Sequence, residues 1–242
     1  MADRSHGSSR APLARLTVVR HGQSTANVLW ARALETGDPE LVGEGTDAQV
    51  RLSRIGVEQA RALGRWLAGL RGDERPGLVV CSTYARAAET WDVMADSARE
   101  VGCTSLPGAV VDERLRDREM GVLELLPPPA VRTRAPEEAA RRARLGEWFY
   151  RPPGGESLAD VALRVRDFLT EVRAAGTAEH VLLVAHDSVV IAARHVLAGI
   201  GDPVPGDVPV PNASVSSWER DPGGGTWLRL VEFGSVRHLG EG

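Results

Sequence analysis

The chain has 242 residues, of which 43% are hydrophobic, so it can bury a sizeable core as one large domain or two small ones. Its formal net charge of −4 gives no indication of a nucleic-acid binder. All 29 basic residues are arginine, which we interpret as compositional bias. An arginine therefore supports a functional argument only through its position.

The N-terminal segment 1–13 is polar and rich in glycine and serine, so we expect a disordered tail and no signal peptide. No apolar run approaches the roughly 18 residues of a membrane span. Cys81 and Cys103 match no disulfide or metal spacing, and Cys81 lies in an apolar run that indicates burial. These features predict a soluble cytoplasmic protein that binds neither membrane nor nucleic acid.

Strand-like and helix-like patterns alternate along the chain. Apolar runs predict strands, and periodic patterns predict helices after most of them. Ser53 is a plausible N-cap, and Ser157 with Asp160 resembles a capping box. Strands are expected at 16–19, 77–82, 108–113, 180–185, 213–219 and 226–232, and helices at 53–70, 85–100, 157–176 and 188–199. The last two strands read as an antiparallel pair. The alternation predicts a three-layer α/β/α sandwich with a mainly parallel central sheet.

Two segments interrupt this alternation. Residues 29–51 contain a possible helical turn followed by a loop rich in glycine and acidic residues, and residues 126–156 contain a helix between two proline-rich breaks. Insertions of this size are often lids or binding loops. We therefore expect residues 14–242 to form one domain with two insertions near its site.

Polar side chains follow four of the predicted strands. In a doubly wound sheet, ligands bind outside the carboxyl ends of the strands, so these residues are expected to share one site. In chain order they are Arg20 and His21; Ser82 and Arg86; Glu113, Arg116 and Asp117; His186 and Asp187.

This set of residues is suited to phosphate chemistry. Arginine forks match a group with several oxygens, and the helix expected after His21 adds backbone donors. A neutral imidazole is a competent nucleophile toward phosphorus, and a nearby carboxylic acid can protonate the leaving oxygen. A metal site is disfavoured, because the histidines lack metal-ligand spacing and arginines oppose a cation. We expect neither a metal nor another cofactor.

Six segments resemble the histidine phosphatase (phosphoglycerate mutase-like) superfamily, and they occur in the family's order. The R-H-G signature alone is weak, whereas the ordered set is specific. The segments are "VVRHGQSTAN" (18–27), "LSRIGVEQARALG" (52–64), "CSTYARAAET" (81–90), "DERLRDREMGVLE" (112–124), "RPPGGES" (151–157) and "LLVAHDSVV" (182–190).

The resemblance implies a role for each matching residue. His21 is similar to the histidine that becomes phosphorylated. Arg20, Arg86 and His186 resemble the residues that hold the phosphoryl group, and Asn27 matches a phosphate-contacting asparagine. Ser24 either contributes a hydroxyl to this site or caps the following helix.

The chain departs from the family pattern at two positions. The family acid is usually a glutamate four residues before a glycine, and here Asp117 precedes Gly121; Glu113 is the competing candidate. We expect the acid to be protonated below neutrality and the arginines to depress the pKa of His21. Asp187 replaces a residue that is commonly small, and we interpret it as a helix cap, the alternative being a carboxylate that weakens phosphate binding.

The resemblance implies a phosphomonoester hydrolase that acts through phosphohistidine on a small phosphorylated metabolite. The segment after Asp117 breaks early into prolines and lacks the mutase insertion, so the chain looks like the broad-specificity phosphatase branch. The alternatives are a phosphoglycerate mutase-type phosphomutase and an inactive regulator that binds a phosphorylated ligand.

Overall fold

The computed structural model describes residues 13–199, 203, 208–223 and 228–240. Its centre is a six-stranded sheet in the order β3-β2-β4-β1-β5-β6. The first four strands in that order pair in parallel, and the last two pairings are antiparallel. The strands are β1 (Arg15–Arg20), β2 (Leu78–Cys81), β3 (Ala109–Val111), β4 (His180–Ala185), β5 (Val215–Arg220) and β6 (Leu228–Ser235).

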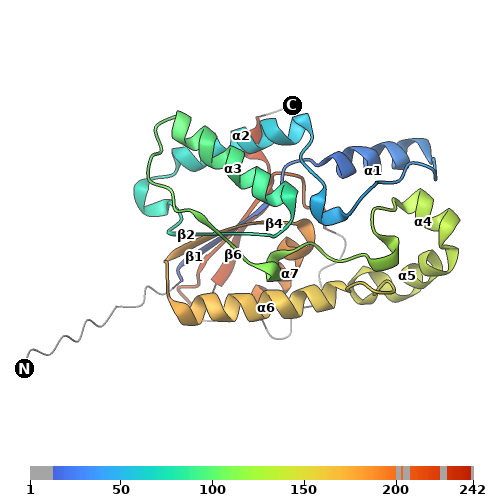
Figure 1. The fold of residues 1–242 in the computed structure, drawn as a ribbon. Coiled ribbons are helices and arrows are strands. Elements are labelled where there is room, and N and C mark those ends of the chain that lie inside the picture. The colour runs from blue at the N-terminus through green and yellow to red at the C-terminus, as the bar shows by residue number, and fades with distance from the viewer. Residues whose placement is uncertain (1–12, 200–202, 204–207, 224–227, 241–242) are drawn as a thin grey trace, which may run out of the picture.

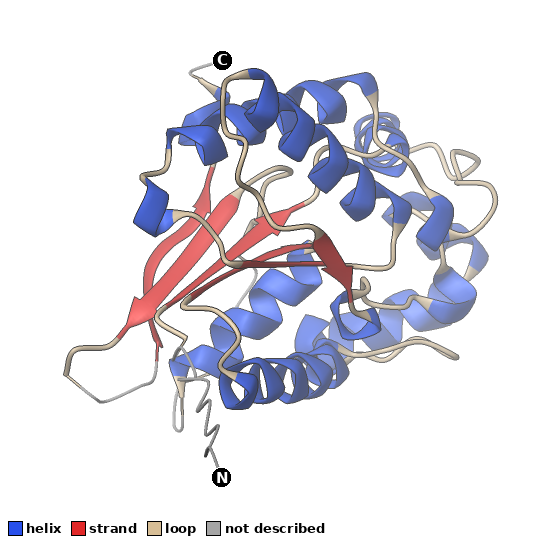
Figure 2. Ribbon diagram, turned by 60° about the vertical axis from the view of Figure 1, so that its left-hand side comes forward, coloured by secondary structure: helices blue, strands red, loops and turns tan. Residues whose placement is uncertain are grey.

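Helices cover both faces of this sheet (Figures 1 and 2). They are α1 (Thr25–Thr36), α2 (Arg54–Gly69), α3 (Ala85–Glu100), α4 (Pro128–Arg134), α5 (Pro136–Phe149), α6 (Leu158–Ala175) and α7 (Asp187–Ala198). Because side chains alternate along a strand, Leu182 and Val184 pack toward α2 and α3, whereas Val181 and Leu183 pack toward α6 and α7. The predicted three-layer sandwich is confirmed. None of the described helices has the length and apolar character needed to cross a membrane.

Most of the predicted helices and strands are observed at or close to the predicted residues. Ser53 caps α2 by accepting from the Gly56 N–H, and Ser157 and Asp160 form the expected capping box of α6. The antiparallel pair is β5–β6; residues 226 and 227 of its second run lie outside the described residues. The third strand is shorter than predicted, because the Asp112 side chain accepts from the Arg114 N–H and starts a 3-10 turn.

Both insertions are more helical than the sequence indicated. The possible helical turn of the first is the later part of α1, which begins at Thr25, before the insertion, and which Gly37 ends in a left-handed conformation. The second contains two helices, α4 and α5, separated at Pro136, whose ring cannot continue the preceding helix. The insertions also contact each other, because Arg134 Nη2 of the second lies 2.8 Å from Glu40 Oε2 of the first. Figure 1 shows α1, α4 and α5 together at one side of the molecule.

The predicted N-terminal tail needs one correction. Residues 1–12 lie outside the described residues, but Leu13 is buried in the core beside α6 and α7. The neighbouring Ala14 N–H donates to the Glu179 carbonyl, which fixes the entry to β1. Leu13 therefore belongs to the folded domain and not to the tail.

Two close backbone contacts explain why glycine is needed at positions 22 and 121, which lie in segments that resemble the family. A Cβ on Gly22 would lie 2.5 Å from the Gly56 carbonyl oxygen, so the turn after β1 packs directly on the start of α2. Similarly, a Cβ on Gly121 would lie 2.1 Å from the Pro153 carbonyl oxygen, and Gly121 has φ +52°. The first contact fixes the turn that carries His21, and the second anchors the segment after Asp117.

Candidate active site

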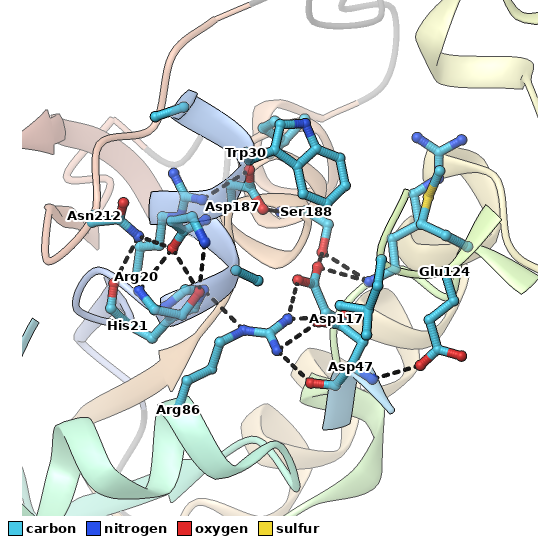
Figure 3. Close-up of a pocket in the computed structure, with 18 of the residues that line it drawn as sticks. Arg20, His21, Trp30, Asp47, Arg86, Asp117, Glu124, Asp187, Ser188 and Asn212 are labelled. Carbon is cyan, nitrogen blue, oxygen red and sulfur yellow. Dashed lines mark hydrogen bonds and ion pairs between the residues drawn. The ribbon is translucent and has the colours of Figure 1, made fainter. Parts of the chain in front are cut away.

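His21 lies at the carboxyl end of β1 with its side chain against the cavity (Figure 3). Its Nδ1 is 2.7 Å from the Gly22 carbonyl oxygen, so the ring proton belongs on Nδ1 and the lone pair on Nε2. Burial, His186, Arg86 and Arg20 lower the pKa of His21 well below 6.5. The imidazole is therefore neutral, and the expected effect of the arginines on its pKa is confirmed.

The two predicted phosphate-binding arginines flank the same cavity. Arg86, in the first turn of α3, is 4% exposed and donates from Nε to His21 Nε2 at 3.2 Å. Arg20 donates from Nη1 to the Val210 carbonyl, and its buried Nε has no hydrogen-bond partner among the described residues. A buried donor beside a neutral nucleophile is suited to an anionic oxygen.

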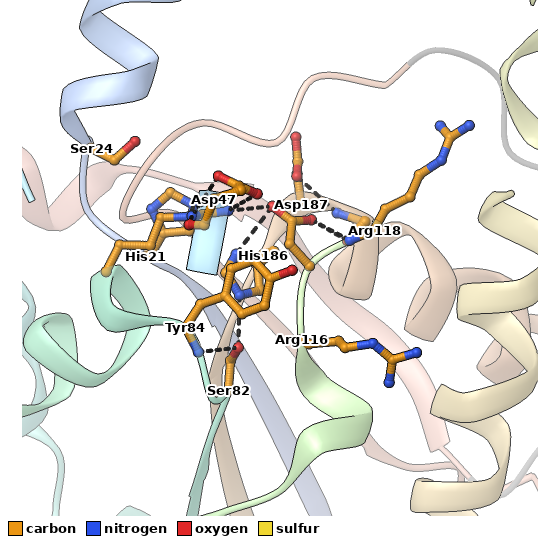
Figure 4. Close-up of polar contacts among 12 residues, drawn as sticks. His21, Ser24, Asp47, Ser82, Tyr84, Arg116, Arg118, His186 and Asp187 are labelled. Carbon is orange, nitrogen blue, oxygen red and sulfur yellow. Dashed lines mark hydrogen bonds and ion pairs between the residues drawn. The ribbon is translucent and has the colours of Figure 1, made fainter. Parts of the chain in front are cut away.

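His186 lies directly against His21, with ring centroids 5.1 Å apart. Its Nε2 is 2.8 Å from Ser82 Oγ, and its Nδ1 is 3.3 Å from Asp117 Oδ2 (Figure 4). Burial lowers the pKa of His186, although Asp117 opposes this shift. The Tyr84 ring packs against His186 in a T-shaped arrangement with ring centroids 5.1 Å apart, and His186 is fully buried.

The structure separates the two candidate acids. Asp117 lines the cavity and accepts from Arg86 Nη2 at 2.8 Å and from Ser188 Oγ at 2.7 Å. Glu113 is exposed, pairs with Arg116 at 3.1 Å and is not among the lining residues. Asp117 is therefore the candidate acid that can reach a ligand.

The expected protonation of Asp117 is wrong for the free protein. Burial raises the pKa of its carboxyl, but His186, Arg86 and the Ser188 hydroxyl outweigh burial and hold the pKa well below its usual range. Asp117 is therefore ionised before a ligand binds. The spacing between Asp117 and Gly121 indicated that Asp117 lines the site. It did not indicate how many hydrogen-bond donors and positive charges surround the carboxylate and lower its pKa.

Asn27 and Ser24 form the capping box of α1. Ser24 Oγ accepts from the Asn27 N–H at 3.1 Å and donates to Asn27 Oδ1 at 3.0 Å, so the hydroxyl serves as a helix cap. Asn212 Nδ2 also donates to Asn27 Oδ1 at 3.0 Å. The oxygen of Asn27 is thus occupied, and its amide nitrogen is the end suited to an anion.

Asp187 is not an N-cap, because it is the first residue of α7 and His186 occupies the cap position. Its Oδ1 accepts from the Ser188 N–H at 2.9 Å, and its Oδ2 lies 3.5 Å from Arg20 Nη2. Asp187 therefore contributes to the helix start and also places a negative charge beside a predicted phosphate-binding arginine.

Asp47 and Ser188 also belong to the site, although they were not predicted from the sequence. Asp47, from the first insertion, binds Arg86 Nη1 at 2.9 Å and Nη2 at 3.0 Å through its two carboxylate oxygens. Burial raises the pKa of Asp47, and Arg86 opposes this shift. No sequence signal shows where this loop runs. Ser188 lies two residues after His186 in the recognised segment 182–190, so its position there could have indicated its contact with Asp117.

The cavity above these residues has a volume of about 570 Å³. His21, Asp117 and His186 offer metal-ligand atoms within 4.8 Å of one another, the one such group found in the described part of the chain. Arg86 contacts both His21 and Asp117, and its fixed positive charge opposes a cation there. The site is better suited to an anion than to a metal.

The sequence profile of the histidine phosphatase superfamily (branch 1) matches residues 16–232. The chain belongs to this superfamily. It is 31% identical over 226 residues to fructose-2,6-bisphosphatase TIGAR B of Danio rerio, covering 93% of this chain and 74% of that protein. It is 35% identical over 177 residues to a 2,3-bisphosphoglycerate-dependent phosphoglycerate mutase of Sinorhizobium fredii, covering 71% and 73%.

Solved structures of the histidine phosphatase superfamily have the same fold. The mycobacterial glucosyl-3-phosphoglycerate phosphatase in complex with VO3 superposes with a TM-score of 0.70 at 27% identity, covering 92% of this chain and all of that one. The relatives confirm the resemblance carried by the six segments. The protein is an enzyme, and the phosphatase interpretation agrees with its relatives.

Proposed function

We propose that the protein hydrolyses phosphomonoesters of small metabolites through a phosphohistidine at His21, as expected for the broad-specificity branch. One observation carries this proposal: the neutral His21 faces the cavity with its Nε2 lone pair beside the Arg86 guanidinium. In the first step Nε2 bonds to phosphorus, the ester P–O bond breaks, and the alcohol oxygen takes a proton from Asp117. In the second step water attacks phosphorus and gives a proton to Asp117, the N–P bond breaks, and inorganic phosphate leaves.

Substrate binding would allow Asp117 to take up from solvent the proton that it lacks in the free enzyme. The negative phosphoryl group would neutralise the Arg86 charge that holds the pKa of Asp117 down, and its own charge would raise that pKa further. Arg20 and Arg86 supply fixed positive charge where the phosphoryl group develops its transition-state charge. The proposed reaction therefore uses no metal ion. The cytoplasmic location predicted from the sequence stays a prediction.

A trapping experiment tests the intermediate. The enzyme is mixed with ³²P-labelled p-nitrophenyl phosphate, quenched within milliseconds in parallel in acid and in base, and digested for peptide mapping. We expect an acid-labile, base-stable label on the peptide that contains His21. A label on a serine or carboxylate, recognisable by the opposite stability, would refute the proposal, and an inactive regulator would give no covalent label.

A phosphomutase is the second candidate, and the identity to the S. fredii phosphoglycerate mutase favours it. It shares the phosphohistidine but transfers the phosphoryl group to a second substrate oxygen instead of water. Adding 3-phosphoglycerate to the labelled enzyme separates the two reactions. A phosphatase releases inorganic phosphate, whereas a mutase yields labelled phosphoglycerate.

The acid assignment is tested with Asp117→Asn and Glu113→Gln. Asn cannot donate the carboxyl proton, so Asp117→Asn is expected to slow hydrolysis of glycerol 2-phosphate, whose leaving alcohol needs a proton, by about 10²-fold or more. Hydrolysis of p-nitrophenyl phosphate should slow far less, because its leaving group is stable as an anion. Glu113→Gln, matched in chemistry, should change neither rate. A selective loss in Glu113→Gln would transfer the role away from Asp117.

A further inference from the structure

One face of α1 lines the cavity on the side away from Arg86. Four of its residues recur at helical spacing along this wall: Asn27, Trp30, Ala31 and Leu34. Ala33 is the buried residue of α1, so this stripe faces the cavity instead of the core. Trp30 is half-buried and Leu34 is 56% exposed. The helix therefore presents apolar surface that is open to a ligand.

Other apolar side chains extend this surface on the outer side of the cavity, beyond Asp117. They come from the segment after Asp117 and from α6 and α7: Met120, Leu125, Leu158 and Ile191. Figure 3 shows the Trp30 indole among the lining side chains, separated from Arg86 by the Asp117 carboxylate. The apolar surface is continuous with the site where phosphorus would bind, so its natural occupant is the alcohol part of the same ester.

The charges in the outer cavity disfavour a second anion. Arg118 and Arg142 both line it, but both donate to the carboxylate of Glu147. Glu124 lies nearby and accepts from the Asp47 N–H at 2.6 Å. In all, five carboxylates and four guanidiniums line the cavity before any substrate binds. A second phosphate would therefore meet unpaired negative charge and arginines that are already occupied.

We propose that the outer cavity selects a monophosphate whose alcohol part is uncharged and aromatic or branched aliphatic, packed against Trp30, and that it disfavours a second phosphate or carboxylate. This inference rests on the proposed phosphatase function of His21. It also separates the chain from relatives whose names specify bisphosphates, because those ligands carry a second anionic group.

The test compares kcat/KM for 1-naphthyl phosphate, glycerol 2-phosphate and 2,3-bisphosphoglycerate. The wild type should prefer the naphthyl ester. Trp30→Ala should lower kcat/KM for 1-naphthyl phosphate about 10-fold, mainly through KM, because a buried aromatic contact is lost. It should change that of glycerol 2-phosphate less than about 2-fold. Phe149→Ala, an aromatic 63% exposed that does not line the cavity, is the matched control and should change neither.

A second variant tests the charge argument. Glu124→Gln keeps the oxygen that accepts from Asp47 but removes a negative charge, so it should raise kcat/KM for 2,3-bisphosphoglycerate relative to that for 1-naphthyl phosphate. A wild type that prefers the bisphosphate, or equal losses for both monophosphates in Trp30→Ala, would overturn the inference while phosphoenzyme still forms. Absence of hydrolysis of every ester, with no label on His21, would overturn the proposed function as well.

Discussion

Replacing His21 with alanine is expected to lower kcat by on the order of 10⁴-fold or more and to remove the phosphoenzyme, because the atom that bonds to phosphorus is lost. The backbone should persist, since the His21 N–H bond to the Ala185 carbonyl and the close contact of Gly22 with Gly56 do not involve the imidazole. The measurement is single-turnover hydrolysis of p-nitrophenyl phosphate together with the label on the enzyme.

Chemical rescue distinguishes a lost nucleophile from a damaged fold. The side chain removed from His21 leaves an imidazole-sized space beside Arg86, so added imidazole should restore part of the activity of His21→Ala without restoring a covalent label. The thermal unfolding midpoint checks the fold independently. A variant that retains near-native turnover, or that loses activity only in proportion to the folded fraction, would show that His21 is not the nucleophile.

The sequence was sufficient to predict the three layers of the fold and the site residues that follow the strands. Apolar runs such as 180–185 are buried on both faces, which gives a continuous hydrophobic signal, and the carboxyl ends of parallel strands meet at one edge. This topology brings four residues to the same edge of the sheet: His21, Arg86, Asp117 and His186. Local capping patterns were equally informative, because they depend on residues three apart in the chain.

The segments that enclose the cavity, namely α1 and the loop that carries Asp47, could not be predicted in the same way. Helix α1 buries Ala33 while its apolar stripe faces the cavity, so the stripe does not mark a core-facing helix as it does in α2. The path of the first insertion depends on contacts with distant parts of the chain, such as those of Gly43 with Leu125 and of Glu40 with Arg134. Asp47, which lies beside Arg86, also donates from its N–H to Glu124, and contacts of this kind between loops leave no periodic pattern in the sequence.

Arg86→Ala is expected to lower kcat by about 10³-fold or more, as for other arginines that stabilise phosphoryl transfer. The guanidinium contacts the nucleophile, the candidate acid and Asp47 at once, so its loss removes charge and alignment together. Arg99→Ala is the matched control, because Arg99 lies near the other end of the same helix in an exposed pair with Asp96. Its kcat should equal that of the wild type.

The pH dependence separates these two contributions of Arg86. The guanidinium lowers the pKa of both His21 and Asp117, so both pKa values should rise in Arg86→Ala. Activity needs neutral His21 in the free enzyme, so the acidic limb of kcat/KM should move to higher pH. It also needs a proton on Asp117 in the enzyme–substrate complex, so the basic limb of kcat should move in the same direction. Arg86→Lys keeps the charge but not the planar fork, so its profile should stay near that of the wild type while kcat remains low. A shift in Arg86→Lys as large as in Arg86→Ala, or no shift in either, would mean that Arg86 does not set these pKa values and acts by alignment alone.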